Sequence, residues 1–143
     1  MKILTHRIEL STIDPIEFID ITDEIRKWVA AIGARSGLVS ITSLHTTARV
    51  NVNESEPQLQ LDMITFLKRF VARDGNYRHN DVAVDGRDNA HSHLLGLFMT
   101  ETETVPVADG ALVFGQWQSI FFIELDGPRE KRTIHLQFMG DAA

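Results

Sequence analysis

The chain has 143 residues, of which 43% are hydrophobic and 24% charged, and its formal net charge is −6. These values predict one globular domain spanning residues 1–143, and the acidic balance without a lysine- or arginine-rich run argues against a nucleic-acid partner. No cysteine is present, which excludes thiolate metal sites, and no apolar stretch is long enough for a membrane span or signal peptide, so we expect a cytoplasmic protein that does not enter a membrane.

The first half of the chain predicts strands around one amphipathic helix. Apolar residues recur at helical spacing from Ile25 to Ile32, with Asp20 or Thr22 as the expected cap and Gly33 or Gly37 as the expected end. β-branched and alternating patterns predict strands on either side of this helix, at Ile3–Leu10, Leu38–Leu44 and Ala48–Val52.

The second half begins with a helix and continues almost entirely as strands. Ser55 is the expected cap and Pro57 the first helical residue, and the helix should stop before Gly75. After a polar segment and a short piece of helix or strand at Asn89–Met99, strand patterns alternate with glycine-containing turns, in the segments TETVPV, ALVFG, QSIFFIEL and RTIHLQFM. Two helices among about seven strands indicate an α+β fold with a mostly antiparallel sheet. The run from Ile120 to Ile123 is apolar on both sides, and a subunit interface is one way to cover the second side.

The polar segment from Gly75 to His93 is the first candidate site. A structureless connection longer than about 12–15 residues is usually functional or disordered, and both interpretations stay open here. His79 and Asp81 are two residues apart, as are His91 and His93, so each pair lies on one side if the backbone is extended. Imidazole and carboxylate are the ligands that a divalent metal such as zinc takes when thiolates are absent.

A second candidate is the segment SLHTTARVNVNE, which brings His45, Asn53 and Glu54 together with two threonine hydroxyls. Alternating polar residues usually mark the solvated face of a strand, but asparagine is depleted in strands, which favours a polar site. The helix expected to start at Ser55 would place its N-terminus beside this cluster, where it could help to hold a phosphate.

A third candidate is the segment around Gly115. This glycine interrupts a strand pattern, which indicates a bulge or a close approach by backbone or ligand. Trp117, which lies beside Gln118, is either a core residue or a wall on which a flat ring can stack.

These segments together resemble the YjbQ-like family, which is also called the secondary thiamine-phosphate synthase family. The resemblance runs over nearly the whole chain, through SLHTTARVNVNE, NYRHND, HLLG, VPVADGALVFGQWQSIFFIE and RTIHLQFMGD. It implies sheets in a sandwich-like arrangement, two main helices, assembly as a homotrimer, and a thiamine phosphate synthase activity. Carried over by motif, the implied site residues are His45, Asn53, Glu54, His79, Asp81, His93, Gly115, Trp117 and Gln118. The chain has extra residues between His79 and His93, so the match does not extend to Asp85, Asp88 and His91.

Two classes of function follow from these residues. The first is a transferase that joins an aminopyrimidine diphosphate to a thiazole phosphate, helped by zinc or magnesium on His45, His79 and His93. In this interpretation Glu54 or Asp81 would act as a base or position the metal; Asn53, Gly115, Trp117 and Gln118 would contact the phosphorylated small molecule, with Trp117 flanking its ring. A metal-dependent hydrolase would use the same ligands. The second class is a trimer that binds a metabolite or metal without chemistry.

Overall fold

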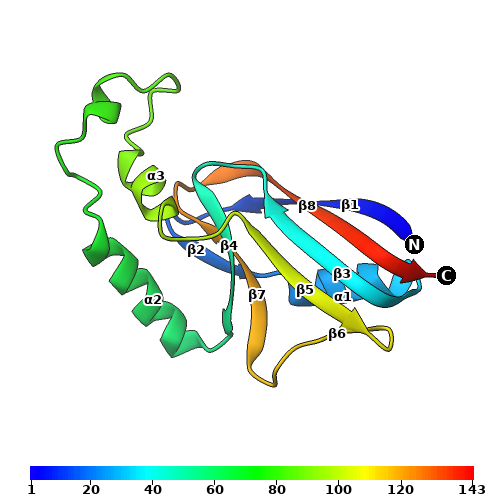
Figure 1. The fold of residues 1–143 in the computed structure, drawn as a ribbon. Helices are drawn as coiled ribbons and strands as arrows, with labels where there is room; N and C mark the ends of the chain where they lie inside the picture. Colours follow the sequence, from blue (N-terminus) through cyan, green and yellow to red (C-terminus); the bar gives the residue numbers. More distant parts are fainter.

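Two antiparallel sheets form the body of the protein, and the computed structural model describes residues 1–143 throughout (Figure 1). The larger sheet has the strand order β1-β8-β3-β5-β6 and the smaller has the order β2-β7-β4. The strands are β1 (Lys2–Thr12), β2 (Glu17–Asp20), β3 (Ala34–Ser43), β4 (Ala48–Glu54), β5 (Thr102–Ala108), β6 (Ala111–Leu112), β7 (Gln118–Glu124) and β8 (Arg129–Ala142). The α+β prediction with antiparallel sheets is therefore confirmed.

The main core lies between the two sheets and is closed by helix α1 (Thr22–Ala31). The larger sheet contributes Val39, Leu136 and Phe138, the smaller contributes Val50 and Phe122, and all five are fully buried. On β8 these inward residues alternate with outward ones, as expected for a strand with one covered face. Helix α1 adds its apolar face to the same cluster.

A second core explains why β7 is apolar on both sides. Phe121 and Ile123 face away from the main core and pack with Leu67 of helix α2 (Pro57–Phe70) and Leu95 of helix α3 (Ala90–Gly96). The helices of the same chain thus cover the second face of β7. No subunit interface is needed for this purpose, although the sequence allowed one.

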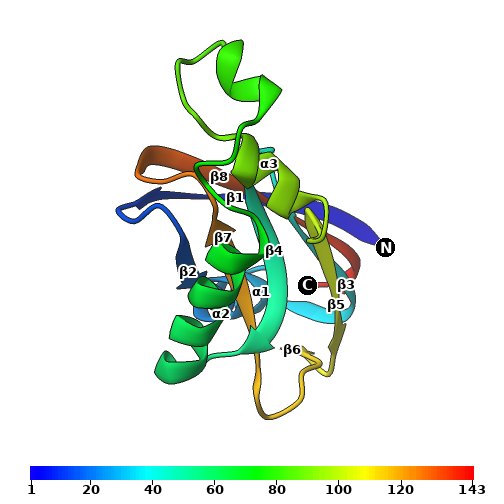
Figure 2. The same ribbon diagram turned by 90° about the vertical axis from the view of Figure 1, so that its left-hand side faces the viewer.

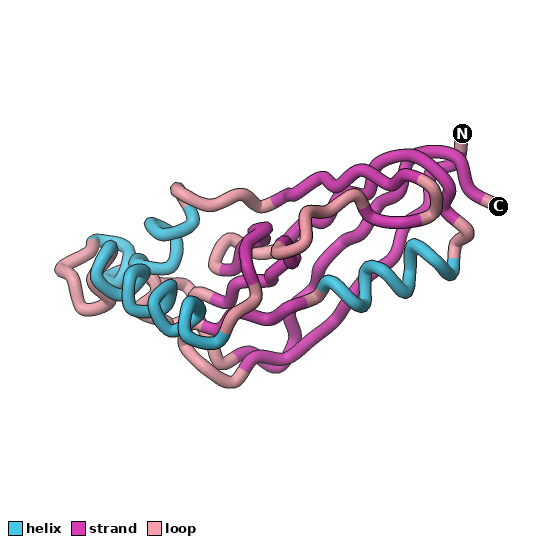
Figure 3. The backbone as a smooth tube through the Cα atoms, turned by 90° about the horizontal axis from the view of Figure 1, so that it is seen from below, coloured by secondary structure: helices cyan, strands magenta, loops and turns pink.

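Helices α2 and α3 gather at one end of the molecule, whereas α1 and both chain termini lie at the other (Figures 1 and 3). Between α2 and α3 the chain projects beyond the sheets and contains a 3₁₀ helix at Arg78–Asp81 (Figure 2). The polar segment predicted from the sequence is therefore ordered into two short helices joined by turns. None of the helices is both long and apolar enough to cross a membrane.

The helix ends differ in detail from the predictions. Helix α2 is capped by Glu56, whose carboxylate accepts hydrogen bonds from the backbone N–H groups of Gln58 and Leu59, and Ser55 is not the cap. Helix α1 is followed by Gly33, as expected, at a φ of +62° that glycine adopts without strain. Strand β2 was not predicted, because its four residues are too short for a periodic pattern.

Candidate active site

One polar cavity of about 430 Å³ lies where β3 ends and β8 begins, beside α3 and the 3₁₀ helix. It is lined by Leu44, His45, Thr46, Thr47, His79, Val84, Asp85, Asn89, His93, Arg129 and Arg132. Three histidines that are far apart in the sequence therefore meet in a single cavity. His45 comes from the loop after β3, His79 from the 3₁₀ helix and His93 from α3.

His45 is held in one orientation by the strand beside it. The backbone N–H of Thr133 on β8 donates to Nε2 of His45 at 2.8 Å, and Leu44 N–H bonds back to the carbonyl of Thr133. Partial burial and the nearby positive charge of Arg132 lower the pKa of His45, so the ring is neutral near pH 7. Because Nε2 accepts a hydrogen bond, the proton of the neutral ring sits on Nδ1, which makes Nδ1 a donor.

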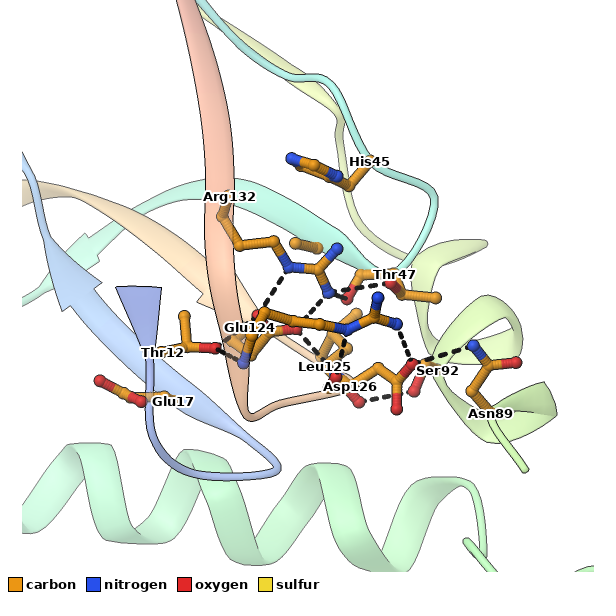
Figure 4. Close-up of polar contacts among 12 residues, drawn as sticks. Thr12, Glu17, His45, Thr47, Asn89, Ser92, Glu124, Leu125, Asp126 and Arg132 are labelled. Atoms are coloured by element: carbon orange, nitrogen blue, oxygen red, sulfur yellow. Dashed lines mark hydrogen bonds and ion pairs between the residues drawn. The ribbon is translucent and has the colours of Figure 1, made fainter. Parts of the chain in front are cut away.

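A buried ion pair lies beneath the cavity (Figure 4). Arg132 donates from Nε to Oε2 of Glu124 at 2.7 Å, from Nη2 to Oε1 of Glu124, and from Nη2 to Oγ1 of Thr47 at 2.9 Å. Glu124 also accepts from Thr12 and from the backbone N–H of Asp126. Burial alone would raise the pKa of Glu124, but these hydrogen bonds outweigh it and hold the pKa below its ordinary value.

A second buried carboxylate, Asp126, is surrounded by three donors. Arg87 donates to Asp126 from Nε at 3.0 Å, and Arg129 donates from Nη2 at 2.6 Å. Asn89 donates from Nδ2 at 2.9 Å. Burial opposes its ionisation, yet the bonds from Asn89, Arg87 and Arg129 lower the pKa of Asp126. With Glu124 and Arg132 included, two carboxylates face three guanidinium groups. This network therefore keeps one positive charge beside the cavity in an otherwise acidic chain.

The two arginines that line the cavity each keep one guanidinium nitrogen unpaired. Hydrogen bonds engage Nε and Nη2 of both Arg129 and Arg132 but Nη1 of neither. In Figure 4 one guanidinium nitrogen of Arg132 points to the side on which the His45 ring lies. The two free Nη1 groups, each with two N–H bonds, and the Nδ1–H of His45 therefore offer donors of the kind that bind phosphate oxygens.

His79 and His93 form a second group in the same cavity. Their ring centroids are 4.9 Å apart in an edge-to-face arrangement, and Nε2 of His79 lies 3.1 Å from Oδ1 of Asn89. Burial, followed by repulsion from His79, lowers the pKa of His93. These two imidazoles suit a divalent cation, but no three histidine or carboxylate side chains gather closely enough to hold one. His45 would have to give up the bond from Thr133 before its Nε2 could join them.

The other residues expected in the site lie elsewhere. Asn53 and Glu54 end β4, where they pair with Ser119 and Gln118 of β7. This is the far end of a seven-residue strand from the cavity, a distance of about 20 Å along the strand. Trp117 is exposed there, so it is not a core residue, and Gly115 donates its N–H to Gln118 in an exposed turn. The close approach expected at Gly115 involves only the Gln118 side chain.

The acidic and histidine residues of the polar segment also separate. Asp85 lines the cavity, whereas Asp81 and Asp88 are exposed and do not line it. His91 is buried on the opposite side of α3, in a small cavity that includes Arg73 and Leu95. Its Nδ1 has no partner in the structure.

Sequence reasoning missed Arg129, Arg132, Glu124, Asp126 and Asn89. A usable signal was present for two of them. Arg132 takes an inward position in the alternation that continues with the buried Ile134, Leu136 and Phe138, and Glu124 directly follows four buried apolar residues. A charged side chain at a buried register position requires a partner, which would have paired these two residues.

Comparisons with known proteins agree with this architecture. The profile of the family described as UPF0047 protein YjbQ-like matches residues 6–141. A UPF0047 protein of Methanothermobacter thermautotrophicus is 39% identical over 132 residues, which cover 92% of this chain and 90% of that protein. A UPF0047 protein of Archaeoglobus fulgidus is 36% identical over 89% of this chain and 95% of its own.

Solved structures show the same fold. A YbjQ-like protein of unknown function from Sulfolobus solfataricus P2 superposes with a TM-score of 0.92 at 37% identity, covering 98% of this chain and 99% of that one. A hypothetical protein from Aeropyrum pernix K1 gives a TM-score of 0.90 at 36% identity, covering 96% of this chain and 99% of that one.

Proposed function

Because the chain belongs to the UPF0047 protein YjbQ-like family, we propose that its cavity binds a phosphorylated small molecule and performs the transfer that its sequence resemblance implies. That reaction joins an aminopyrimidine diphosphate to a thiazole phosphate and releases diphosphate. One observation carries the proposal: His45, His79, His93, Arg129 and Arg132 line a single cavity. Imidazole and guanidinium groups are the side chains that bind and stabilise phosphoryl oxygens.

The arginines and His45 would hold the diphosphate in this proposal. Nη1 of Arg129, Nη1 of Arg132 and Nδ1–H of His45 supply donors, and the ion pairs with Asp126 and Glu124 fix the guanidinium groups in place. Charge builds up on the diphosphate as it leaves, so donors that are already oriented lower the barrier without reorganising. The cavity is wide enough, at about 430 Å³, for a small phosphorylated molecule.

Metal assistance by zinc or magnesium stays a prediction. His79 and His93 are the residues that would hold the ion, and the ion would neutralise charge on the diphosphate. A third protein ligand is not gathered beside them, so the substrate's own phosphate oxygens would have to complete the coordination. The roles expected for Glu54 and Trp117 find no support within one chain, because both lie at the far end of β4 and β7.

Exposed apolar residues support the predicted homotrimer. At the surface of α2 and the turn after α3, Phe66 stacks on Phe70, and Phe70 meets Phe98 edge-to-face. On the larger sheet, Ile3, Met139 and Leu38 form one exposed row across β1, β8 and β3. A ring of identical subunits joins two different patches head to tail, whereas a two-fold dimer needs only one, so two distinct patches favour a ring such as a trimer.

The test is turnover of the aminopyrimidine diphosphate with the thiazole phosphate by the full chain and a His79→Ala variant. A matched control is His135→Ala, since His135 is a half-buried residue of β8 outside the cavity. We expect His79→Ala to lose activity and His135→Ala to retain it. Equal rates in all three proteins would contradict the proposal. Diphosphate release without the thiazole phosphate would identify a hydrolase, and saturable binding without turnover would identify a binding protein.

A further inference from the structure

Two histidines of the cavity are held with opposite hydrogen-bonding capacities. A single contact fixes the tautomer of His45, because a backbone N–H can only donate. Thr133 N–H donates to Nε2 at 2.8 Å, so the neutral ring carries its proton on Nδ1. His45 therefore presents an N–H group to the cavity and has no free lone pair.

For His79 the tautomer follows from a chain of three residues. Asp126 is ionised, because the hydrogen bonds that it accepts lower its pKa, so it can only accept from Asn89. The group of Asn89 at 2.9 Å from Asp126 must therefore be its NH₂, which turns Oδ1 toward His79. Oδ1 can only accept, so Nε2 of His79 carries a proton, and in the neutral form of the ring Nδ1 keeps a free lone pair.

Asn89 lies where its side chain can fix which nitrogen of His79 carries the proton. It is buried, and its partner Asp126 is fixed by Arg87 and Arg129 at 3.0 and 2.6 Å. Its own side chain touches both Asp126 and His79. Because the two contacts use opposite ends of one amide, rotating the amide would place two acceptors together at Asp126 and could not be tolerated there.

We propose that His45 and His79 form a donor and acceptor pair of fixed, opposite tautomer, and that Asn89 is the positioning residue that sets the tautomer of His79. His45 donates to an anionic oxygen of the ligand, beside the arginines. Where no metal ion occupies it, the Nδ1 lone pair of His79 accepts from a group of the same ligand that carries hydrogen, such as an amino or hydroxyl group. The ligand is thus a phosphorylated molecule with a hydrogen-bond donor next to its phosphate. The ligand named here rests on the proposed function of the cavity. The tautomers of His45 and His79 do not depend on that function.

The experiment is ¹⁵N NMR of the histidine rings in the full chain, using two-bond couplings that report which nitrogen carries the proton. It is recorded at about pH 8, above the ordinary imidazole pKa of about 6.5. We expect protonated Nδ1 for His45 and protonated Nε2 for His79. Protonated Nδ1 on His79, or protonated Nε2 on His45, would overturn the assignment. The NMR measurement does not require turnover. A wrong tautomer assignment can therefore be distinguished from a wrong proposed function.

Two variants test the role of Asn89. Asn89→Leu should leave His45 unchanged and convert His79 to a mixture of tautomers. Asn80→Ala is the matched control, because Oδ1 of Asn80 accepts from Ala90 N–H and so joins the 3₁₀ helix to α3, whereas the ring of His79 bonds to Asn89. We expect the control to keep the Nε2–H form. An unchanged tautomer in Asn89→Leu, or the same mixture in both variants, would refute a positioning role.

Kinetics provide a second readout if the transfer reaction is observed. Asn89→Leu should lower kcat by about tenfold or more, the usual effect of removing a residue that orients a functional histidine. The KM for the diphosphate substrate should stay within about twofold, because Arg129 and Arg132 keep their own bonds to Asp126 and Glu124. A rise in KM without a fall in kcat would instead assign Asn89 to ligand binding.

Discussion

Replacing Arg132 by methionine should destabilise the fold strongly. The substitution leaves the fully buried carboxylate of Glu124 without its counter-charge, and it removes both hydrogen bonds to Glu124 and the two to Thr47. Removing one partner of a buried ion pair typically costs about 3–5 kcal/mol. Thr12 and the N–H of Asp126 still bind Glu124, which argues for the lower half of this range.

The assay is urea unfolding followed by circular dichroism at one fixed protein concentration. Arg35→Met is the matched control, because Arg35 pairs with Asp141 through two hydrogen bonds on the exposed surface. Solvent screening leaves such an exposed pair with little effect on stability. Adding Glu124→Gln to Arg132→Met should recover part of the loss, since no buried charge is then left alone. A loss in Arg132→Met no larger than in Arg35→Met would refute the account of the buried pair.

Three other predictions concern pH, assembly and metal. The pKa values of His45, His91 and His93 are lowered in the folded protein, mainly by burial. The unfolded chain therefore binds more protons than the folded chain near and below about pH 6.5, and the free energy of unfolding should fall as the pH drops from there to the folded pKa values. Urea titrations from about pH 7.5 to 5.5 check this, and a constant free energy would contradict it. Phe98→Glu or Met139→Glu should each dissociate the proposed trimer in light scattering, and a trimer that survives both changes would exclude the two patches as its contacts. Metal analysis of protein purified without a histidine tag should find zinc or magnesium that is lost in His93→Gln, whereas equal metal content would remove the metal prediction.

The fold was largely predictable because its elements carry local patterns. The helical spacing of Ile25 and Val29 and the alternation along β8 each arise from one buried face. The two-sided burial of β7 was also readable from its sequence. The sequence did not show which segment covers the second face of β7, because the packing of α2 against Phe121 depends on contacts between distant segments.

The site was predictable in its histidines but not in their chemistry. Composition and motif pointed to His45, His79 and His93, which do share a cavity. Glu54 was grouped with His45 because both belong to the segment SLHTTARVNVNE, and Trp117 was added through the family resemblance. The seven-residue strand β4 separates Glu54 from the cavity. The tautomers of His45 and His79 depend on a backbone N–H and a buried amide, and no sequence pattern encodes such partners.

The central claim is that the cavity binds phosphate groups through Arg129, Arg132 and His45. Isothermal titration of the full chain with inorganic diphosphate tests it most directly, with Arg129→Gln and Glu54→Gln as the two variants. Arg129→Gln leaves Asp126 with Arg87 and Asn89, so no buried carboxylate is left without a partner. We expect saturable binding that Arg129→Gln weakens by about tenfold or more, the loss of about 1.4 kcal/mol or more that one charge-assisted contact represents, and that Glu54→Gln leaves unchanged. Diphosphate that does not bind, or that binds equally to the parent and Arg129→Gln, would contradict the claim.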